Sequence, residues 1–402
     1  MAEITASSDW WRLEDDGTLY IYCVGNMPSR EWEDYISDIT SAVIADGVTD
    51  IANYAFKDCT SLTSVTIPDG VTSIGVSAFY RCSALTSIAI PDSVTSIDGF
   101  VFEYCRSLTS VTIPDGVTSI GRYAFYNCTN LTSVTIPNSV TSIEAYAFQS
   151  CRSLTDITIP YGVTTIGEYA FYGCRGVIGI TIPDSVTSIG ASAFGFCAGL
   201  TSAIISSGVT SMKSYTFRNC TALTSVTIPD SVTNIAAGAF YECTSLSDVY
   251  YSGAEEEWNN ISIGSNNDTL LNATVHSKTL SSIAVTTPPT KTAYIVGETF
   301  DTSGMLVTAS YSDGTTAAVT NYTTSPVTPL AANNTTIAVS YTKGNVTQIT
   351  SVSITVTIPW ITYNGSSKVI RRLCEAVNGL YSAPRLFVDA EGYISVKYSG
   401  GE

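Results

Sequence analysis

Basic side chains are scarce in this sequence. Only 18 of its 402 residues are lysine or arginine, against 35 aspartates and glutamates, and the formal net charge is −17. Proteins that bind nucleic acid or anionic lipid need a basic surface that displaces counterions from the phosphates. The composition therefore disfavours both partners, and we expect no nucleic-acid binding.

Long apolar runs are missing as well. The sequence contains no stretch of about 18 apolar residues, which is what a membrane-spanning helix requires. Its first residues, MAEITASSDWW, also lack a basic region followed by an apolar one. We therefore expect no membrane insertion, and no signal peptide in the sequence as it stands.

Motifs for catalysis and metal binding are equally sparse. The single histidine, His276, would have to serve any Ser-His or Cys-His couple, and it falls in a segment that we expect to be a linker. There is no glycine-rich phosphate loop, and the evenly spaced cysteines supply no local Cys-x-x-Cys pair for zinc. We expect no cofactor, no metal site and no enzymatic activity.

The dominant feature of the sequence is a strict 23-residue period. Nine copies of one motif, typified by LTSVTIPDGVTSIGRYAFYNC at residues 108–128, run from residue 39 to residue 245. An unbroken period of this length is typical of a solenoid, in which each unit stacks on its neighbours. A single unit buries too little apolar surface to offset its ordering entropy, so the copies must fold together.

One copy is expected to contain a strand, a turn and a short helical segment. Residues 108–113 alternate as a strand does, with the apolar side chains facing inward. Residues 114–116, Pro-Asp-Gly, favour a turn. Residues 123–128 are too few for a full helix and are expected to form a single helical turn, on which Phe125 and Cys128 share a face.

Phenylalanine and cysteine recur in register in all nine copies. Cysteines one copy apart could lie about 5 Å from each other, which would permit disulfides. Nine is an odd number, however, and the Phe-x-x-Cys spacing directs both side chains inward, so we expect buried free thiols. The core positions expected in the central copies are Phe79, Phe102, Phe125, Phe148, Phe171, Cys82, Cys105, Cys128, Cys151 and Cys174.

The segments on either side of the repeats are expected to cap them. Residues 1–38, with Trp10, Trp11 and Trp32, are suited to cover the first copy, and residues 246–278 to cover the last. Exposed solenoid ends require such cover because their core would otherwise face water.

The remainder of the chain has a different texture. Residues 279–357 alternate between short apolar strands and turns, which is typical of a small β-sandwich. Residues 358–402 are expected to form a small α+β segment of unknown role, with a helix over 366–380 and strands over 385–390 and 393–398.

The repeat pattern L-x-x-V-x-I-P-x-x-V-x-x-I-x-x-x-A-F-x-x-C resembles the BspA-type leucine-rich repeat of surface proteins from bacteria and some protists. Residues 288–316, PPTKTAYIVGETFDTSGMLVTASYSDGTT, resemble a bacterial Ig-like domain. The resemblance implies a mainly β protein, in which a curved right-handed leucine-rich-repeat solenoid with short strands and single-turn helical segments precedes an Ig-like β-sandwich. It also implies adhesion or recognition at a cell surface, without catalysis.

Two sets of side chains are candidates for ligand contact. One is the hydroxyl-bearing, concave strand face, and the other is a tyrosine-rich edge formed by two columns of the repeat. Each also has a purely structural interpretation, because a sheet face can simply be polar and a phenol ring can simply cover the neighbouring coil. The candidate residues are Thr109, Thr112, Thr132, Thr135, Tyr123, Tyr146, Tyr169, Tyr126 and Tyr172.

Our leading hypothesis is a non-catalytic, extracellular or cell-surface adhesion protein that recognises a protein or glycan ligand on a host or neighbouring cell. The alternative is a structural or receptor-binding component of a phage virion that docks to the particle through residues 358–402. The first would be favoured by an export signal in the complete reading frame, and the second by ordered multimers of that C-terminal segment.

Overall fold

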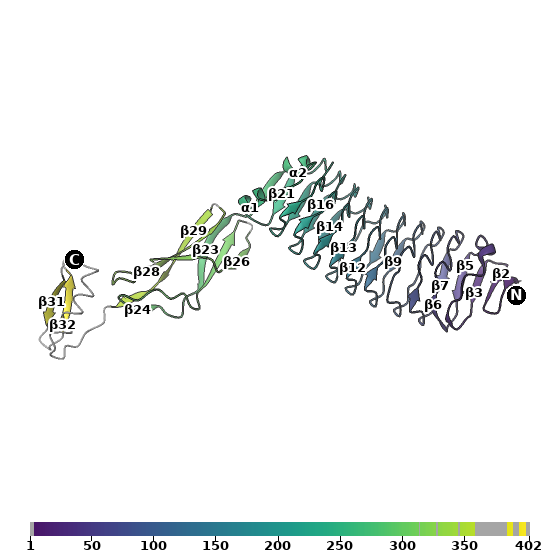
Figure 1. Ribbon diagram of the computed structural model, residues 1–402, viewed down its shortest axis with the longest axis horizontal. Coiled ribbons are helices and arrows are strands. Elements are labelled where there is room, and N and C mark those ends of the chain that lie inside the picture. The colour runs from purple at the N-terminus through teal and green to yellow at the C-terminus, as the bar shows by residue number, and fades with distance from the viewer. Residues whose placement is uncertain are drawn as a thin grey trace. The chain divides into compact units, whose positions relative to one another are not determined.

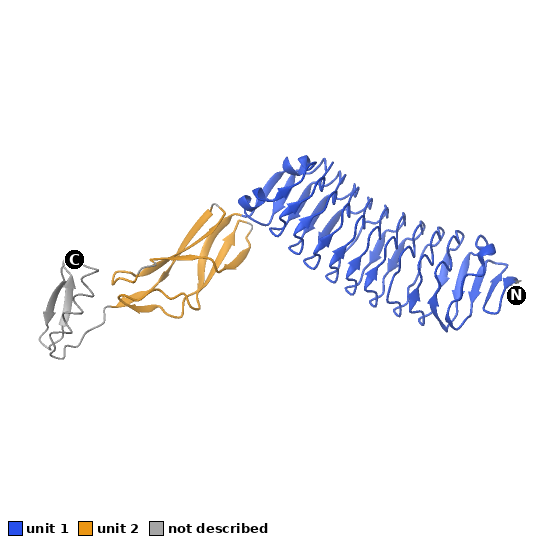
Figure 2. Cartoon of the chain, in the orientation of Figure 1, with its two compact units in different colours: residues 1–278 blue, residues 279–402 orange. Residues whose placement is uncertain are grey.

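The computed structural model describes residues 4–312, 314–326, 329–344, 346–357, 384–388 and 394–398. The chain divides into two compact units, residues 1–278 and residues 279–402 (Figure 2). Strands dominate, and the described α-helices have only four or five residues, far short of what would cross a lipid bilayer. The protein is therefore mainly β, as the sequence predicts.

The first unit is a solenoid, and its coils stack through a ladder of parallel strands (Figure 1). Partners in this ladder are one repeat apart, so that Ser110 pairs with Ser133 and Ser202 with Ser225. Outward Ser and Thr flank an inward Val in residues 110–112 and 133–135, as the sequence predicts. The strands are β3 (Thr18–Ile21), β5 (Ser41–Ile44), β7 (Ser64–Thr66), β9 (Ser110–Thr112), β11 (Ser133–Thr135), β14 (Gly179–Ile182), β16 (Ser202–Ile205), β18 (Ser225–Ile228), β20 (Asp248–Tyr251) and β22 (Thr274–Ser277).

A second parallel ladder, which the sequence analysis did not anticipate, runs along another side of the coils. It follows the Pro-Asp-Gly turn, and each copy contributes little more than a Ser-Ile pair. Ser119 pairs with Ser142, and Ile120 with Ile143, so the buried isoleucines align from coil to coil. The strands are β4 (Gly25–Asn26), β6 (Val48–Ile51), β8 (Ser73–Ile74), β10 (Ser119–Ile120), β12 (Ser142–Ile143), β13 (Thr165–Ile166), β15 (Ser188–Ile189), β17 (Ser211–Met212), β19 (Asn234–Ile235) and β21 (Ser262–Ile263).

The third side of each coil consists of tight turns rather than the single helical turn that we expected at residues 123–128. Tyr123 and Asn127 both have positive φ, 58° and 60°, and a residue in this conformation ends an α-helix. The backbone N–H groups here donate to the following coil, as in Phe125 N–H to the Ala147 oxygen at 2.8 Å. The turns therefore also bind neighbouring coils together.

The phenylalanines form one continuous stack through the core. Phe125 lies 5.3 Å from Phe102 and 5.1 Å from Phe148, and Phe148 lies 5.3 Å from Phe171, measured between ring centroids. The planes of neighbouring rings in this stretch are within 19° of parallel. All the expected core phenylalanines, Phe79, Phe102, Phe125, Phe148 and Phe171, are buried.

The column cysteines are buried free thiols with a structural hydrogen bond. The Cys128 Sγ donates to the Phe102 carbonyl oxygen at 3.1 Å, and Cys82, Cys105, Cys151 and Cys174 make the same contact with the phenylalanine of the preceding copy. Burial raises the pKa of these thiols well above its usual value. They are therefore protonated donors that satisfy turn carbonyls, and poor nucleophiles.

The two ends of the phenylalanine stack meet specific partners. At the N-terminal end, Trp32 is buried 5.9 Å from Phe56, and its Nε1 donates to the Ala55 oxygen at 3.0 Å. At the C-terminal end, the buried Asn267 accepts a hydrogen bond from the Phe240 N–H at 2.9 Å and donates to the Ala236 oxygen at 3.0 Å. These side chains supply the hydrogen bonds that a further coil would make.

The remaining elements at the two ends extend this cover. Antiparallel strands β1 (Ile4–Ser7) and β2 (Trp11–Glu14) precede β3, and the short 3-10 helix η1 (Glu33–Tyr35) follows Trp32. Helices α1 (Glu255–Asn259) and α2 (Asp268–Leu271) lie at the other end. Trp258 of α1 is buried with its ring 5.4 Å from Tyr251.

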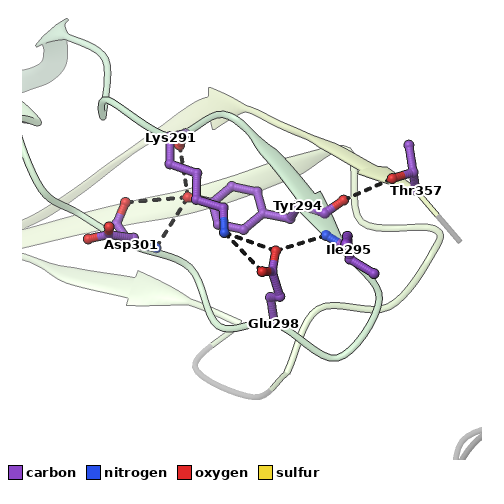
Figure 3. A network of polar contacts seen from close by, with 6 residues as sticks. All are labelled: Lys291, Tyr294, Ile295, Glu298, Asp301 and Thr357. Carbon is purple, nitrogen blue, oxygen red and sulfur yellow. Dashed lines mark hydrogen bonds and ion pairs between the residues drawn. The ribbon is translucent and has the colours of Figure 1, made fainter. Parts of the chain in front are cut away.

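The second unit contains short sheets around a separate apolar core. It has β23 (Leu280–Thr287), β25 (Leu306–Tyr311) and β26 (Thr316–Val319) in one sheet and β27 (Thr323–Ser325), β28 (Thr336–Lys343) and β29 (Val346–Ser353) in another, with β24 (Ala293–Ile295) paired to β30 (Thr355–Thr357). Tyr294 of β24 is buried, and its hydroxyl donates to the Lys291 oxygen at 2.8 Å (Figure 3). The Lys291 ammonium pairs with Glu298, which also accepts the Ile295 N–H, so one polar network fixes this turn (Figure 3).

In the C-terminal segment, β31 (Pro384–Val388) and β32 (Ile394–Tyr398) form an antiparallel pair close to the two strands that we expected. The helix expected over 366–380 lies outside the described residues, as does most of the segment to which we assigned a possible assembly role.

We expect the copy at residues 200–222 to be the least protected part of the solenoid. Ala203 stands where most other copies have a larger aliphatic residue, Ser206 replaces the turn proline and Met212 replaces isoleucine. A smaller core side chain and a freer turn lower the local free energy of opening. Hydrogen exchange should show faster amide exchange here than in residues 108–130, and uniform protection across the array would contradict this expectation.

Candidate ligand-binding edge

Four aromatic residues one repeat apart form a ring stack on the turn side of the solenoid. Successive centroids of Phe100, Tyr123, Tyr146 and Tyr169 are 5.0, 4.5 and 5.0 Å apart, with planes within 14° of parallel. All four side chains are half-buried, since neighbouring rings cover each other's faces while the edges remain accessible. Both interpretations of the tyrosine column thus apply, because the rings protect one another and also form an exposed surface.

The backbone at these positions is in the left-handed region. The φ angles of Tyr123, Tyr146 and Tyr169 are 58°, 63° and 54°, a conformation that is uncommon for bulky residues. Their N–H groups donate to the next coil, as in Tyr146 N–H to the Glu168 oxygen at 2.9 Å, so the coil geometry imposes it. Three of the other copies place Ser77, Ser192 and Gly238 here, and two place Tyr54 and Tyr215. The left-handed backbone at this position therefore does not require an aromatic side chain in the central copies.

The second tyrosine column packs against the first. Tyr126 lies 5.4 Å from Tyr123 with ring planes at 68°, and Tyr172 lies 5.4 Å from Tyr169 at 58°. Burial raises the pKa of the Tyr126 and Tyr172 phenols, so both remain protonated hydrogen-bond donors at neutral pH. The structure thus brings all five candidate tyrosines together, and with Phe100 we call them the aromatic edge.

Cationic side chains accompany the aromatic edge, and they are not among the candidates predicted from the sequence. The Arg122 guanidinium lies 5.2 Å from the Tyr123 centroid and 5.3 Å from that of Tyr146. All eight lysines and arginines between residues 39 and 245 lie after the second strand of their copy, none on the strands themselves: Lys57, Arg81, Arg106, Arg122, Arg152, Arg175, Lys213 and Arg218. The restriction of these lysines and arginines to one part of the repeat is visible in the sequence, and it could have predicted cations beside the tyrosine columns.

A carboxylate is buried at one end of the aromatic edge. Glu103 is 9% exposed, and it occupies the column of Tyr80 and Tyr126 in the adjacent coils. Burial raises its pKa to about 7, and the nearby positive charge of Arg81 opposes that rise. The charge of Glu103 is therefore the most pH-sensitive feature of this region near neutrality.

We expect Glu103→Gln to stabilise the fold in a pH-dependent way. A carboxyl whose folded pKa is about 7, raised from 4.5, favours folding below pH 4.5, and this contribution is lost as the pH rises to 7. The gain in unfolding free energy from the substitution should be small near pH 4, grow up to pH 7 and stay constant above it. Urea unfolding of both proteins at several pH values measures this, with the exposed Glu144→Gln as control. A gain independent of pH would contradict the assignment.

The candidate threonines form a separate set on the strand side. The Thr109 hydroxyl donates to the Thr86 oxygen at 3.2 Å, and the Thr132 hydroxyl donates to the Thr109 oxygen at 3.0 Å. These two hydroxyl groups therefore form hydrogen bonds between adjacent coils. Thr112 and Thr135 are also exposed, and their hydroxyls make no hydrogen bond to the described residues, so these two remain available to a partner.

His276 lies in strand β22, which corrects our expectation of a linker. It continues the parallel ladder beside β20, its Nε2 is 2.7 Å from Asp248 Oδ1, and its ring stacks 4.8 Å from that of Tyr250. No cluster of three or more His, Cys, Asp or Glu side chains suited to a metal ion occurs within the described part of the chain.

A parallel solenoid with a fixed 23-residue repeat and a continuous phenylalanine core places the first unit among leucine-rich-repeat proteins. The chain belongs to the family described as BspA type leucine rich repeat region, whose pattern in six copies matches residues 34–155 and 141–269. Residues 287–358 match the bacterial Ig-like domain of group 3.

Similar solved structures come from several bacteria. A leucine rich cell surface protein from Faecalibacterium prausnitzii is 31% identical over 65% of this chain and 97% of its own, with a TM-score of 0.32. A leucine-rich repeat protein from Eubacterium ventriosum is 25% identical over 62% and 84%, with a TM-score of 0.39. The T. pallidum leucine rich repeat protein is 28% identical over 50% and 87%, with a TM-score of 0.38. No curated protein matches the sequence.

Family membership has a general functional meaning. Proteins of this family are typically bacterial surface proteins and generally non-catalytic, and the family suggests a protein-binding or adhesion role. The expectation of a leucine-rich-repeat solenoid followed by an Ig-like domain is confirmed.

Proposed function

We propose that this chain is an extracellular adhesion or recognition protein whose aromatic edge contacts a protein or glycan ligand on a host or neighbouring cell. One observation carries the proposal. Aromatic side chains are stacked and half-exposed in successive central coils, at left-handed positions where three other copies have serine or glycine. Bulky residues in the left-handed conformation strain the backbone, and this strain occurs beside an accessible surface, as is common at functional sites.

The composition of the edge suits binding. Tyrosine and arginine are the residue types that contribute most to interface affinity, and here Arg122 lies over Tyr123 and Tyr146. Stacked rings have lost much of their rotational freedom already, so contact with a ligand costs less entropy. Phenol hydroxyls at one-coil intervals can hydrogen-bond to a ligand that extends along the solenoid axis.

The other parts of the molecule have supporting roles in this proposal. Thr112 and Thr135 offer outward hydroxyls on the strand side, where no arginine or aromatic residue accompanies them in the sequence of those strands. The Ig-like unit serves as a spacer that carries the solenoid away from its point of attachment. Neither part replaces the edge as the principal contact.

The test compares the wild-type chain with a triple Tyr→Ser variant at positions 123, 146 and 169. Serine occurs in this column at Ser77 and Ser192 with similar φ, so the coil geometry should be retained. Both proteins are screened against an array of glycans and extracellular matrix proteins. We expect ligands of the wild type to bind the variant at least about 100-fold more weakly. Equal affinity of a correctly folded variant would refute the proposal.

A further inference from the structure

Exposed apolar side chains interrupt the hydroxyl-bearing surface of the first strand ladder between residues 178 and 204. Ile178 stands at a threonine position and is 61% exposed, and Ile204 stands at another and is 46% exposed. Gly179 lies between them at a position that is usually serine. Tyr161 replaces the aspartate of the Pro-Asp-Gly turn and is 78% exposed. Large apolar side chains clustered at the surface mark contact sites more often than isolated ones do.

The ladder is also open at this place. In the neighbouring coils the threonine N–H donates to the coil before it, as in Thr155 to Thr132 at 3.2 Å and Thr201 to Ile178 at 2.7 Å. The equivalent bond from Ile178 to Thr155 is missing from the described chain, and residues 157–159 belong to no strand. A backbone N–H and a carbonyl are therefore left without their ladder partners.

A hollow of about 330 Å³ lies beside this opening and is lined by residues of three successive copies. Ile157, Ile159 and Ile180 line it together with Tyr161 and Ile204. We call the hollow and the open rung, at residues 155–161 and 178–181 and at Ile204, the sheet notch. Its size suits one large apolar side chain.

The charges around the sheet notch are acidic. Asp156 and Asp184 are exposed next to lining residues, and the lining itself contains no lysine or arginine. A second copy of this chain, with its net charge of −17, would meet like charge here. The rim therefore favours a basic partner.

We infer that the sheet notch binds an extended peptide segment of a partner protein, with one large apolar side chain flanked by basic residues. The apolar side chain fills the hollow against Tyr161 and Ile204. The segment also donates or accepts a hydrogen bond at the Thr155 carbonyl or the Ile178 N–H, which lack their ladder partner. The flanking cations pair with Asp156 and Asp184. This contact is separate from the aromatic edge and does not depend on it.

A designed peptide tests this inference with the full chain. The probe is a fluorescein-labelled Thr-Lys-Trp-Lys-Thr with blocked termini, and binding is followed by anisotropy. The notch variant combines Tyr161→Asp, Ile178→Thr and Ile204→Thr, which restores residues found at these positions in other copies and so should preserve the fold. We expect saturable binding to the wild type and at least about tenfold weaker binding to this variant.

Two further comparisons identify the site. Asp156→Ser, which introduces the serine that the preceding copy has at this position, should weaken binding and reduce its dependence on salt. The Tyr→Ser variant at positions 123, 146 and 169 should bind the probe as the wild type does. No saturable binding by the wild type, or binding by the notch variant within about twofold of it, would overturn the inference. Loss of binding in the tyrosine variant alone would overturn it as well, without bearing on adhesion through the aromatic edge.

Discussion

Replacing Phe148 with alanine should lower the free energy of unfolding by about 4 kcal/mol. The ring is fully buried, and it stacks 5.1 Å from Phe125 and 5.3 Å from Phe171. Alanine would leave a cavity bounded by two aromatic faces that belong to different coils. Because the coils are held by nearest-neighbour contacts, the array cannot close this gap without shifting one coil on the next. Urea denaturation followed by far-UV circular dichroism measures the loss.

The matched control is Tyr146→Ser, two residues away in the same coil. That ring also stacks on two neighbours, at 4.5 and 5.0 Å, but it is half-exposed. Serine is also accepted in this column at Ser77. We expect a loss of no more than about 1 kcal/mol. Similar losses for the two substitutions would mean that the buried column does not carry the stability of the array.

The solenoid is also expected to unfold steeply in alkali, starting near pH 9. Burial raises the thiol pKa to about 12 for Cys59 and Cys197, from 9.0, and raises it clearly in six further column cysteines: Cys82, Cys105, Cys128, Cys151, Cys174 and Cys220. The unfolded chain loses these protons above pH 9 while the folded chain keeps them. Their stabilisation is thus present below pH 9 and lost as the pH rises towards 12.

Each such thiol contributes a slope of about 1.4 kcal/mol per pH unit in that range. Unfolding free energies between pH 8 and pH 11 therefore measure the effect. Cys128→Ser is the informative variant, because serine does not ionise here and still offers a hydroxyl donor to the Phe102 carbonyl. In this variant the slope of the unfolding free energy against pH should be smaller by the contribution of one thiol. An unchanged slope would assign alkaline unfolding to other groups, such as the tyrosines.

The solenoid could be predicted from the sequence because large core side chains recur at a fixed spacing. Phe125 and Cys128 recur without exception, so their burial in a continuous stack follows from spacing alone. The second ladder could not be read in the same way, since Ser119 and Ile120 are too few to show an alternation. The positive φ at Tyr123 was hidden by its aromatic side chain, although Gly238 in the same column was a hint.

The candidate surfaces could also be predicted only in part from the sequence. The tyrosine columns were visible as spacing, but whether the rings would stack or separate depends on side-chain rotamers that a sequence does not specify. The burial of Glu103 depends on neighbours in adjacent coils. The sheet notch requires the lateral register, which places Thr181 beside Ile204 and leaves residues 157–159 unpaired. Single substitutions such as Ile178 become meaningful only after that register is known.

The central claim is that equivalent residues of successive coils lie directly against one another. A crystal structure of the full chain tests it most directly, through the distances between phenylalanine ring centroids along the array. The account predicts an unbroken series of 5.1 to 5.5 Å from Phe56 to Phe240, with Tyr123, Tyr146 and Tyr169 stacked on the outside. Phenylalanines dispersed among separate cores, or tyrosines turned away from each other, would contradict it.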